Sequence, residues 1–167
     1  ISPTKSASEG FDAVEGKRRS ADAARKRKEL ELAGLLLGHP PLALNHAELV
    51  AGLPFQDPSL DRLRQELLNL AAAGSSLEKT PVLNHLLRLG MAELLTRLGV
   101  RQGSAEPAPE ADPPDPETDA RFLRAALDLR ELAEWEPERA RAFERLGHEA
   151  SEEAWHDVKR FLRAPPK

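Results

Sequence analysis

Side chains that could carry out chemistry are few and scattered in this sequence. Its five histidines, at positions 39, 46, 85, 148 and 156, form no HxxxH or HExxH pair. His39 and His46 are seven residues apart, but Pro40 and Pro41 lie between them and prevent a shared helix face. There is no cysteine, which excludes disulfides and thiolate metal sites. The sequence also lacks a glycine-rich phosphate loop and a nucleophile motif, so it assigns no catalytic or metal-ligating residue.

The aromatic side chains point most directly to a function, and that function is protein binding. Five of the seven aromatic residues lie in the last 51 residues of the chain. A tail of two or three helices cannot enclose so many large side chains, and exposed tryptophan is enriched at binding hot spots. The alternative is that these residues form the core of the tail or pack back on the rest of the chain. The predicted partner-binding residues are Trp135, Trp155, Val158, Phe161 and Leu162.

The charge distribution argues against a dedicated nucleic-acid-binding domain. The net charge is −4, whereas such domains are usually basic. Residues 1–28 contain eight Lys and Arg against four Asp and Glu, a local net charge of +4. The basic cluster at residues 17–28 contains no aromatic side chain to stack on bases, so direct contact with nucleic acid is expected to be weak or absent. No apolar run approaches the length of a membrane span, and no membrane partner is expected.

These residues must be positioned by helices, and a leucine-rich segment is predicted to be the central one. Residues 22–37 end at Gly38 and a double proline, and their apolar residues cover most of the helix circumference. Further helices are predicted at about 42–50, 58–73, 81–89 and 91–98. Asp57 is a favourable N-cap for the second of these, with Pro58 as first helical residue. No period-two alternation predicts a strand.

The predicted fold is all-α, with a small multi-helix bundle followed by a C-terminal helical hairpin. Residues 1–21 are expected to be a disordered basic linker, and residues 22–101 the helical bundle. Residues 102–117 contain five prolines and no basic residue, which predicts an acidic, proline-rich linker. Residues 118–167 are the predicted hairpin, which begins after a cap at Asp115. Pro137 is expected to kink or break its first helix.

Three segments resemble the C-terminal helicase-binding region of bacterial replicative DNA primase. RKRKELELAGLLLGHPPL, residues 25–42, is similar to the opening of that region, where a charged start leads to a leucine-rich helix that ends in a His-Pro pair. LPFQDPSLDRLRQELLNLAAAG, residues 53–74, resembles its next block, and SEEAWHDVKRFLR, residues 151–163, resembles its terminal helix. The resemblance covers about residues 24–165. The residues matched in the first two segments include Arg27, Lys28, Glu29, Leu30, Leu35, Leu36, Leu37, His39, Pro40, Leu42, Phe55, Asp57, Pro58, Leu60, Asp61, Leu63 and Arg64.

The resemblance implies a docking module for the hexameric replicative DNA helicase. In the primase family this region is an all-α bundle followed by a helical hairpin, which brings primase to the replication fork and stimulates the helicase. It implies a cytoplasmic location in bacteria and a role in primer synthesis. The zinc-binding and magnesium-dependent polymerase domains would precede this segment, so no cofactor is expected in it. Whether the chain belongs to an enzyme depends on those domains, and the first residue, Ile1, is consistent with a fragment.

Two other interpretations stay open at this point. The N-terminal domain of a replicative helicase opens with a similar leucine-rich helix, but the basic arm and the tail after an acidic linker fit it poorly. An unrelated α-helical adaptor would share only the helical composition. The proline-rich segment at 102–117 also departs from the compact arrangement that the primase family implies.

Overall fold

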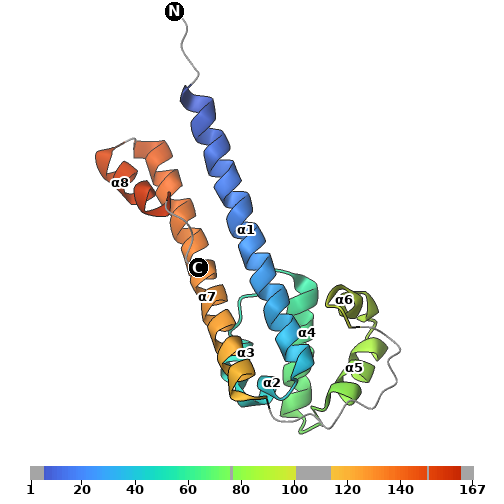
Figure 1. Cartoon of the computed structure of the whole chain (residues 1–167). Helices are drawn as coiled ribbons and strands as arrows, with labels where there is room; N and C mark the ends of the chain where they lie inside the picture. Colours follow the sequence, from blue (N-terminus) through green and yellow to red (C-terminus); the bar gives the residue numbers. More distant parts are fainter. Residues whose placement is uncertain (1–5, 76, 101–113, 150, 163–167) are drawn as a thin grey trace, which may run out of the picture. The chain divides into compact units, whose positions relative to one another are not determined.

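The computed structural model describes residues 6–75, 77–100, 114–149 and 151–162, with side chains from residue 22 onward (Figure 1). Within these ranges the chain forms eight helices and no strand, so the all-α fold expected from the sequence is confirmed. The helices are α1 (Ser6–Gly38), α2 (Leu42–Asn45), α3 (Ala47–Ala51), α4 (Pro58–Ala72), α5 (Lys79–Arg88), α6 (Ala92–Arg97), α7 (Pro116–Glu149) and α8 (Glu152–Phe161).

Two compact units divide the chain, and both include part of α1 and part of α7. Unit 1 comprises residues 1–27 and 131–167, and unit 2 comprises residues 28–130. The predicted domains differ from this division, because the expected bundle ended at residue 101 and the expected hairpin began at residue 118. The first half of α7 instead buries apolar side chains in the core of unit 2. Residues 101–113, most of the predicted linker, lie outside the described residues.

The core of unit 2 is built around the leucine-rich part of α1, as the sequence predicts. Leu32, Ala33 and Leu36 are fully buried. The neighbouring helices bury apolar side chains in the same cluster, which is the arrangement expected of amphipathic helices around a central one. Burial of a leucine side chain contributes about 1.5–3 kcal/mol. The other buried members of the cluster include Leu42, Val50, Leu60, Leu63, Leu67, Val82, Leu86, Leu94, Leu95, Phe122, Ala126 and Leu129.

The N-terminal part of α1 differs from the sequence-based expectation. The helix begins at Ser6, whereas a disordered linker was expected over residues 1–21. Residues 6–21 contain no proline and are rich in alanine, glutamate, lysine and arginine, all of which favour helix. A helix already nucleated in the leucine-rich segment extends at low cost through such residues. Residues 1–5 lie outside the described residues.

The start of α4 is fixed by the side chain of Asp57, which confirms the predicted cap. Its Oδ1 atom accepts a hydrogen bond from the backbone N–H of Ser59 at 2.9 Å. Its Oδ2 atom accepts a second from Arg97 on α6 at 2.7 Å. One carboxylate therefore caps α4 and ties α6 to it.

A buried carboxylate on α1 holds the segment that leads into α4. Glu29 is only 2% exposed, and burial of an acidic group is unfavourable unless hydrogen bonds compensate it. Its two carboxylate oxygens accept the backbone N–H groups of Gln56 (2.8 Å) and Asp57 (3.3 Å). Because the buried carboxylate needs these donors, the contact fixes the path of the loop against α1.

The first half of α7 is held in unit 2 by polar contacts around its apolar stripe. Lys28 on α1 pairs with Asp128 at 2.9 Å. This hydrogen bond raises the pKa of Lys28, although burial opposes the rise. His46 separates α2 from α3, where a single short helix was predicted. Its Nε2 lies 2.6 Å from Asp119 Oδ1, and its ring stacks on Phe122 with centroids 5.5 Å apart.

Two features were predicted for α7, a cap at Asp115 and an interruption at Pro137, and they had different outcomes. Asp115 caps the helix as expected, because its Oδ1 accepts the backbone N–H of Thr118 at 2.7 Å, which lowers the pKa of Asp115. Of the kink or break that was expected at Pro137, the break is wrong, since α7 continues through it to Glu149. Trp135 and Ala142 on either side of the proline belong to one apolar cluster, and this packing holds both flanking turns.

Replacing Phe122 by alanine tests whether α7 belongs to the core of unit 2. The ring is fully buried, so Phe122→Ala should lower the free energy of unfolding by about 3–5 kcal/mol. Leu127→Ala is the matched control, because this side chain is on the same helix and 60% exposed; it should change the value by less than about 0.5 kcal/mol. Urea denaturation followed by circular dichroism measures both. Equally small effects would contradict the assignment.

Replacing Asp57 by asparagine separates its charge from its role as a cap. Burial alone raises the pKa of Asp57, but the hydrogen bonds from Arg97 and the Ser59 N–H outweigh it and hold the pKa below 3.8. The ionised group therefore stabilises the fold above pH 3.8, and this stabilisation is lost as the pH falls through the folded-state pKa.

Asparagine still caps a helix but cannot pair with Arg97. Asp57→Asn should thus lower the free energy of unfolding by about 0.5–1 kcal/mol at neutral pH. The difference from the unmodified protein should shrink as the solution is acidified. Denaturation curves of both proteins at neutral and acidic pH provide the measurement. A difference that is independent of pH would mean that the charge of Asp57 is unimportant.

Candidate functional site

Unit 1 contains the residues that were predicted to bind a partner, and local sequence explains how α8 presents them. Ser151 caps α8, because its Oγ accepts the backbone N–H of Ala154 at 3.2 Å. Glu152 and Glu153 lie in the first turn, and Lys159 and Arg160 lie in the last. This order of charges complements the helix dipole, so α8 is stabilised at both ends.

A small apolar core forms between α7 and α8. Ala142 on α7 is buried together with Val158 and Phe161 on α8. The ring of Phe161 meets Trp135 edge-on, with centroids 5.9 Å apart. The expectation that Val158 and Phe161 face a partner is therefore wrong. Ala154, Val158 and Phe161 are spaced along one face of α8, and that face supplies the core of the unit.

Trp135 and Leu162 contribute to the same core but are only half-buried. The guanidinium of Arg139 lies 5.2 Å from the ring centroid of Trp135 and 5.6 Å from that of Phe143. Each such cation–π contact contributes about 0.5–1 kcal/mol at exposed sites. These contacts indicate that Trp135 mainly serves the packing of unit 1.

Trp155 is the exception among the predicted binding residues. Its side chain is 43% exposed, on the polar face of α8 beside the exposed residues His156 and Asp157. The ammonium group of Lys159 lies 5.7 Å from the ring centroid. A large aromatic side chain in this setting offers apolar area and a neighbouring positive charge to an incoming surface. Among the described side chains of unit 1, Trp155 is thus the one best placed to contact another protein.

The charged residues of α8 border a hollow of about 380 Å³, which is lined by His156, Asp157, Lys159 and Arg160. Asp157 also pairs with Arg145 on α7 at 2.8 Å. Because both partners are exposed, this pair contributes little to stability. The hollow therefore offers charged groups that are close to Trp155 in the sequence and remain accessible to a partner.

Two of the three histidines of unit 2 pair with carboxylates. His46 contacts Asp119, and His85 lies 3.3 Å from Glu66. Over the described residues, no group of three His, Asp or Glu side chains is arranged to hold a metal ion. In the same ranges, no helix combines the length and the apolar character that are needed to cross a membrane.

A second concave region, in unit 2, was missed by the sequence reasoning. It involves Ser59 and Arg62 on α4 and Glu93 and Arg97 on α6. Ser59 and Arg62 are three residues apart, and Glu93 and Arg97 are four apart. This spacing, which places the members of each pair on one helix face, can be read from the sequence. The same spacing recurs on most solvent-exposed helix faces, so it could not identify a site without the fold.

Replacing Phe161 by alanine tests whether this ring supports unit 1. The sequence has two tryptophans, so a Trp155→Phe background leaves Trp135 as the fluorescent reporter. In that background Phe161→Ala should lower the stability of the region around Trp135 by about 3 kcal/mol, because a buried ring is lost. The urea midpoint of the Trp135 signal measures this, and Trp155→Phe alone should leave it unchanged. An unchanged midpoint with Phe161→Ala would contradict the packing role.

The candidate site is therefore the exposed ring of Trp155 with the charged groups of α8 around it. Its geometry suits the binding of a protein surface. No family model, no curated protein and no solved structure matches this chain.

Proposed function

We propose that this chain is the helicase-binding region of a bacterial DNA primase and that it docks onto the hexameric replicative helicase. The observation that carries the proposal is the 43% exposure of Trp155. This residue lies in segment 151–163, which resembles the terminal helix of the primase region. The resemblance of residues 25–42 and 53–74 to the two earlier blocks of that region supports the same assignment.

The all-α fold and its division into a larger and a smaller unit also support the proposal. Residues 25–42 supply the central helix of unit 2, and residues 53–74 supply α4 and the capped segment before it. The resembling segments thus carry the main packing and capping contacts of the bundle. This is expected if the resemblance reflects a shared architecture as well as a shared helical composition.

Docking in this proposal centres on Trp155 and extends over other exposed residues. Buried aromatic side chains dominate the energetics of many interfaces. A stable interface covers about 800 Å² of each partner, which is more than one face of a ten-residue helix such as α8 provides. Other exposed surface of the chain must therefore take part in the proposed interface. Two weak contacts carried on one chain gain affinity through effective concentration.

The proposed role is recruitment, and primer synthesis belongs to other parts of the protein. In this reading the polymerase chemistry, with its zinc and magnesium, resides in catalytic domains outside this segment. The segment brings those domains to the helicase at the replication fork in the bacterial cytoplasm. The exposed charges of α8, such as Lys159 and Arg160, would tune the rate and specificity of that encounter.

Mixing the chain with the hexameric replicative helicase of the same source tests the proposal. Size exclusion with light scattering should detect a complex of defined stoichiometry. Trp155→Ala should weaken the affinity by about tenfold or more, because an aromatic anchor is lost. Leu127→Ala is the matched control, since it removes another exposed apolar side chain, and it should leave the affinity unchanged.

Removal of residues 150–167 tests the docking surface independently. This deletion removes α8 and keeps the sequence of α7 up to Glu149. Circular dichroism should confirm that the helices of unit 2 persist, and binding should be lost. Full binding by both variants would place the docking surface elsewhere. No complex at micromolar concentration, with both proteins folded, would contradict the helicase assignment and favour an unrelated α-helical adaptor.

A further inference from the structure

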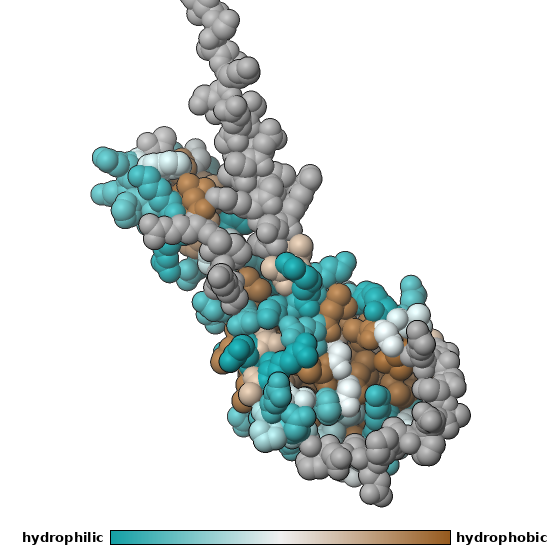
Figure 2. Space-filling view, in the orientation of Figure 1, coloured by the Kyte–Doolittle hydropathy of each residue, from teal (hydrophilic) through white to brown (hydrophobic). Residues whose placement is uncertain are grey.

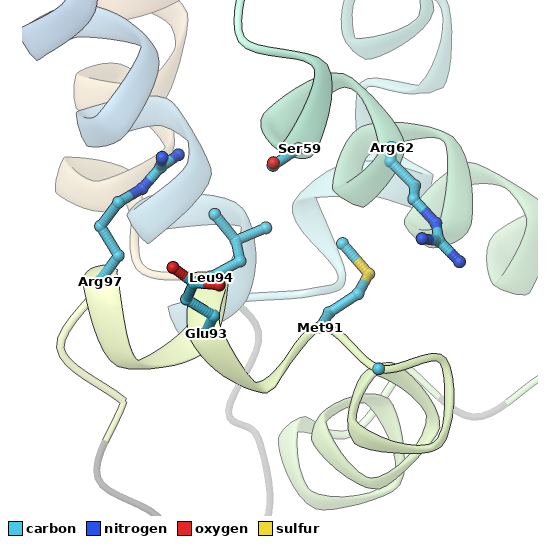
Figure 3. A pocket seen from close by; sticks show the side chains of 7 residues that line it. Ser59, Arg62, Met91, Glu93, Leu94 and Arg97 are labelled. Atoms are coloured by element: carbon cyan, nitrogen blue, oxygen red, sulfur yellow. The ribbon is translucent and has the colours of Figure 1, made fainter.

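A concavity of about 240 Å³ lies in unit 2 between α4 and the turn that leads into α6. Figure 3 shows Ser59 and Arg62 on α4, Met91 at the turn, and Glu93, Leu94 and Arg97 at α6. Brown, hydrophobic side chains are gathered on the face of unit 2 where α5 and α6 lie (Figure 2). The concavity thus combines polar walls with an apolar surrounding.

Local sequence explains the polar walls. Ser59 and Arg62 are three residues apart on α4, and Glu93 and Arg97 are four apart on α6, so each pair lies on one helix face. The turn before α6 requires Gly90, whose φ of +76° is disfavoured for other residues. This turn sets the direction in which α6 leaves α5 and so spaces the two walls.

The floor of the concavity is apolar and firmly packed. Met91 and Leu94 are 5% and 6% exposed, and both belong to the core cluster of unit 2. Their remaining exposed atoms can accept an apolar group without rearrangement of the core. The floor is therefore preformed, which reduces the entropy lost on binding.

The charges on the walls are unequally engaged. Arg97 pairs with Asp57 at 2.7 Å. The guanidinium of Arg62 makes one long hydrogen bond, at 3.4 Å to the carbonyl of Leu89. A guanidinium has five N–H donors, so most of those on Arg62 are not used within the described ranges. In the same ranges the carboxylate of Glu93 makes no hydrogen bond or ion pair.

We propose that this concavity binds a short peptide segment of a protein partner in which an acidic side chain adjoins an apolar one. A carboxylate suits the planar donors of Arg62, which can bind both of its oxygens. The apolar side chain would lie on Met91 and Leu94. The carboxylate of Glu93 would accept a backbone N–H of the peptide.

The charge balance favours a peptide over a phosphorylated ligand. Arg62 and Arg97 are offset by Asp57 and Glu93, so the local net charge is zero. Glu93 would repel a phosphate dianion about twice as strongly as a singly charged carboxylate at the same distance, and the single charge of the carboxylate can be balanced by Arg62 alone. No aromatic side chain lines the concavity to stack on a nucleotide base. The site lies within unit 2 and does not rest on the proposed helicase-binding function.

The methyl group of Met91 is a direct reporter for this proposal. Met91 is the single methionine in the sequence, so isotopic labelling of methionine methyl groups gives one NMR signal in the full chain. Titration with a capped Leu-Glu-Leu tripeptide should shift this signal saturably. A capped Leu-Gln-Leu tripeptide should bind about fivefold more weakly or worse, because it lacks the carboxylate for Arg62.

Arg62→Gln should weaken the binding of Leu-Glu-Leu by a similar factor and remove the preference over Leu-Gln-Leu. Arg88→Gln is the matched control, because Arg88 is an exposed arginine at the end of α5 that does not line the concavity. It should preserve both the affinity and the preference. The proposal is overturned if Met91 shows no saturable shift with Leu-Glu-Leu. Equal binding of the two peptides, or equal weakening in both variants, would also overturn it.

Discussion

The leucine-rich part of α1 must be covered on more than one side, and this requirement organises unit 2. Leu32 and Leu36 have no exposed surface. One neighbouring helix covers one stripe of a helix, so several short helices are needed to bury them. The short turns between the helices of unit 2, several of them at glycine or proline, let a brief stretch of chain contribute side chains repeatedly to this core. Glu29 lies in this segment, and its carboxylate fixes the loop before α4 at the same place.

The same requirement explains why the bundle takes in the first half of α7. Phe122, Ala126 and Leu129 are fully buried in the cluster that surrounds α1. The ion pair between Lys28 on α1 and Asp128 on α7, at 2.9 Å, helps to fix how these two helices are aligned, because it can form in only one alignment of them. A helix can contribute to two cores only if different parts of its apolar stripe pack in each core. In α7 the stripe serves unit 2 up to residue 130, and the later residues serve the core with α8.

Sequence reasoning succeeded where the determining interactions are local. Asp57, Asp115 and Ser151 each cap the helix that follows, as short-range hydrogen bonding predicts. The extent of the bundle depended on contacts distant in sequence, and the proline-rich composition of 102–117 drew attention to a boundary that the packing does not follow. The exposed ring was in principle predictable. Ala154, Val158 and Phe161 define the apolar face of α8, and Trp155 lies off that face. The concavity beside Arg62 could not be predicted, because it requires the angle between α4 and α6.

Trp155 and the concavity differ in chemistry, and this difference bears on how the protein recognises others. Folding does not require the exposed ring, since α8 already buries three residues on its other face. The ring is therefore available for the proposed docking contact. Arg62 and Glu93 offer directional hydrogen bonds, which contribute specificity more than affinity. Trp155, as an apolar anchor, would supply affinity for a partner. The concavity, with its directional polar contacts, would supply selectivity. Because both are carried on one chain, simultaneous engagement would exceed either contact alone in affinity, without any enlargement of the individual sites.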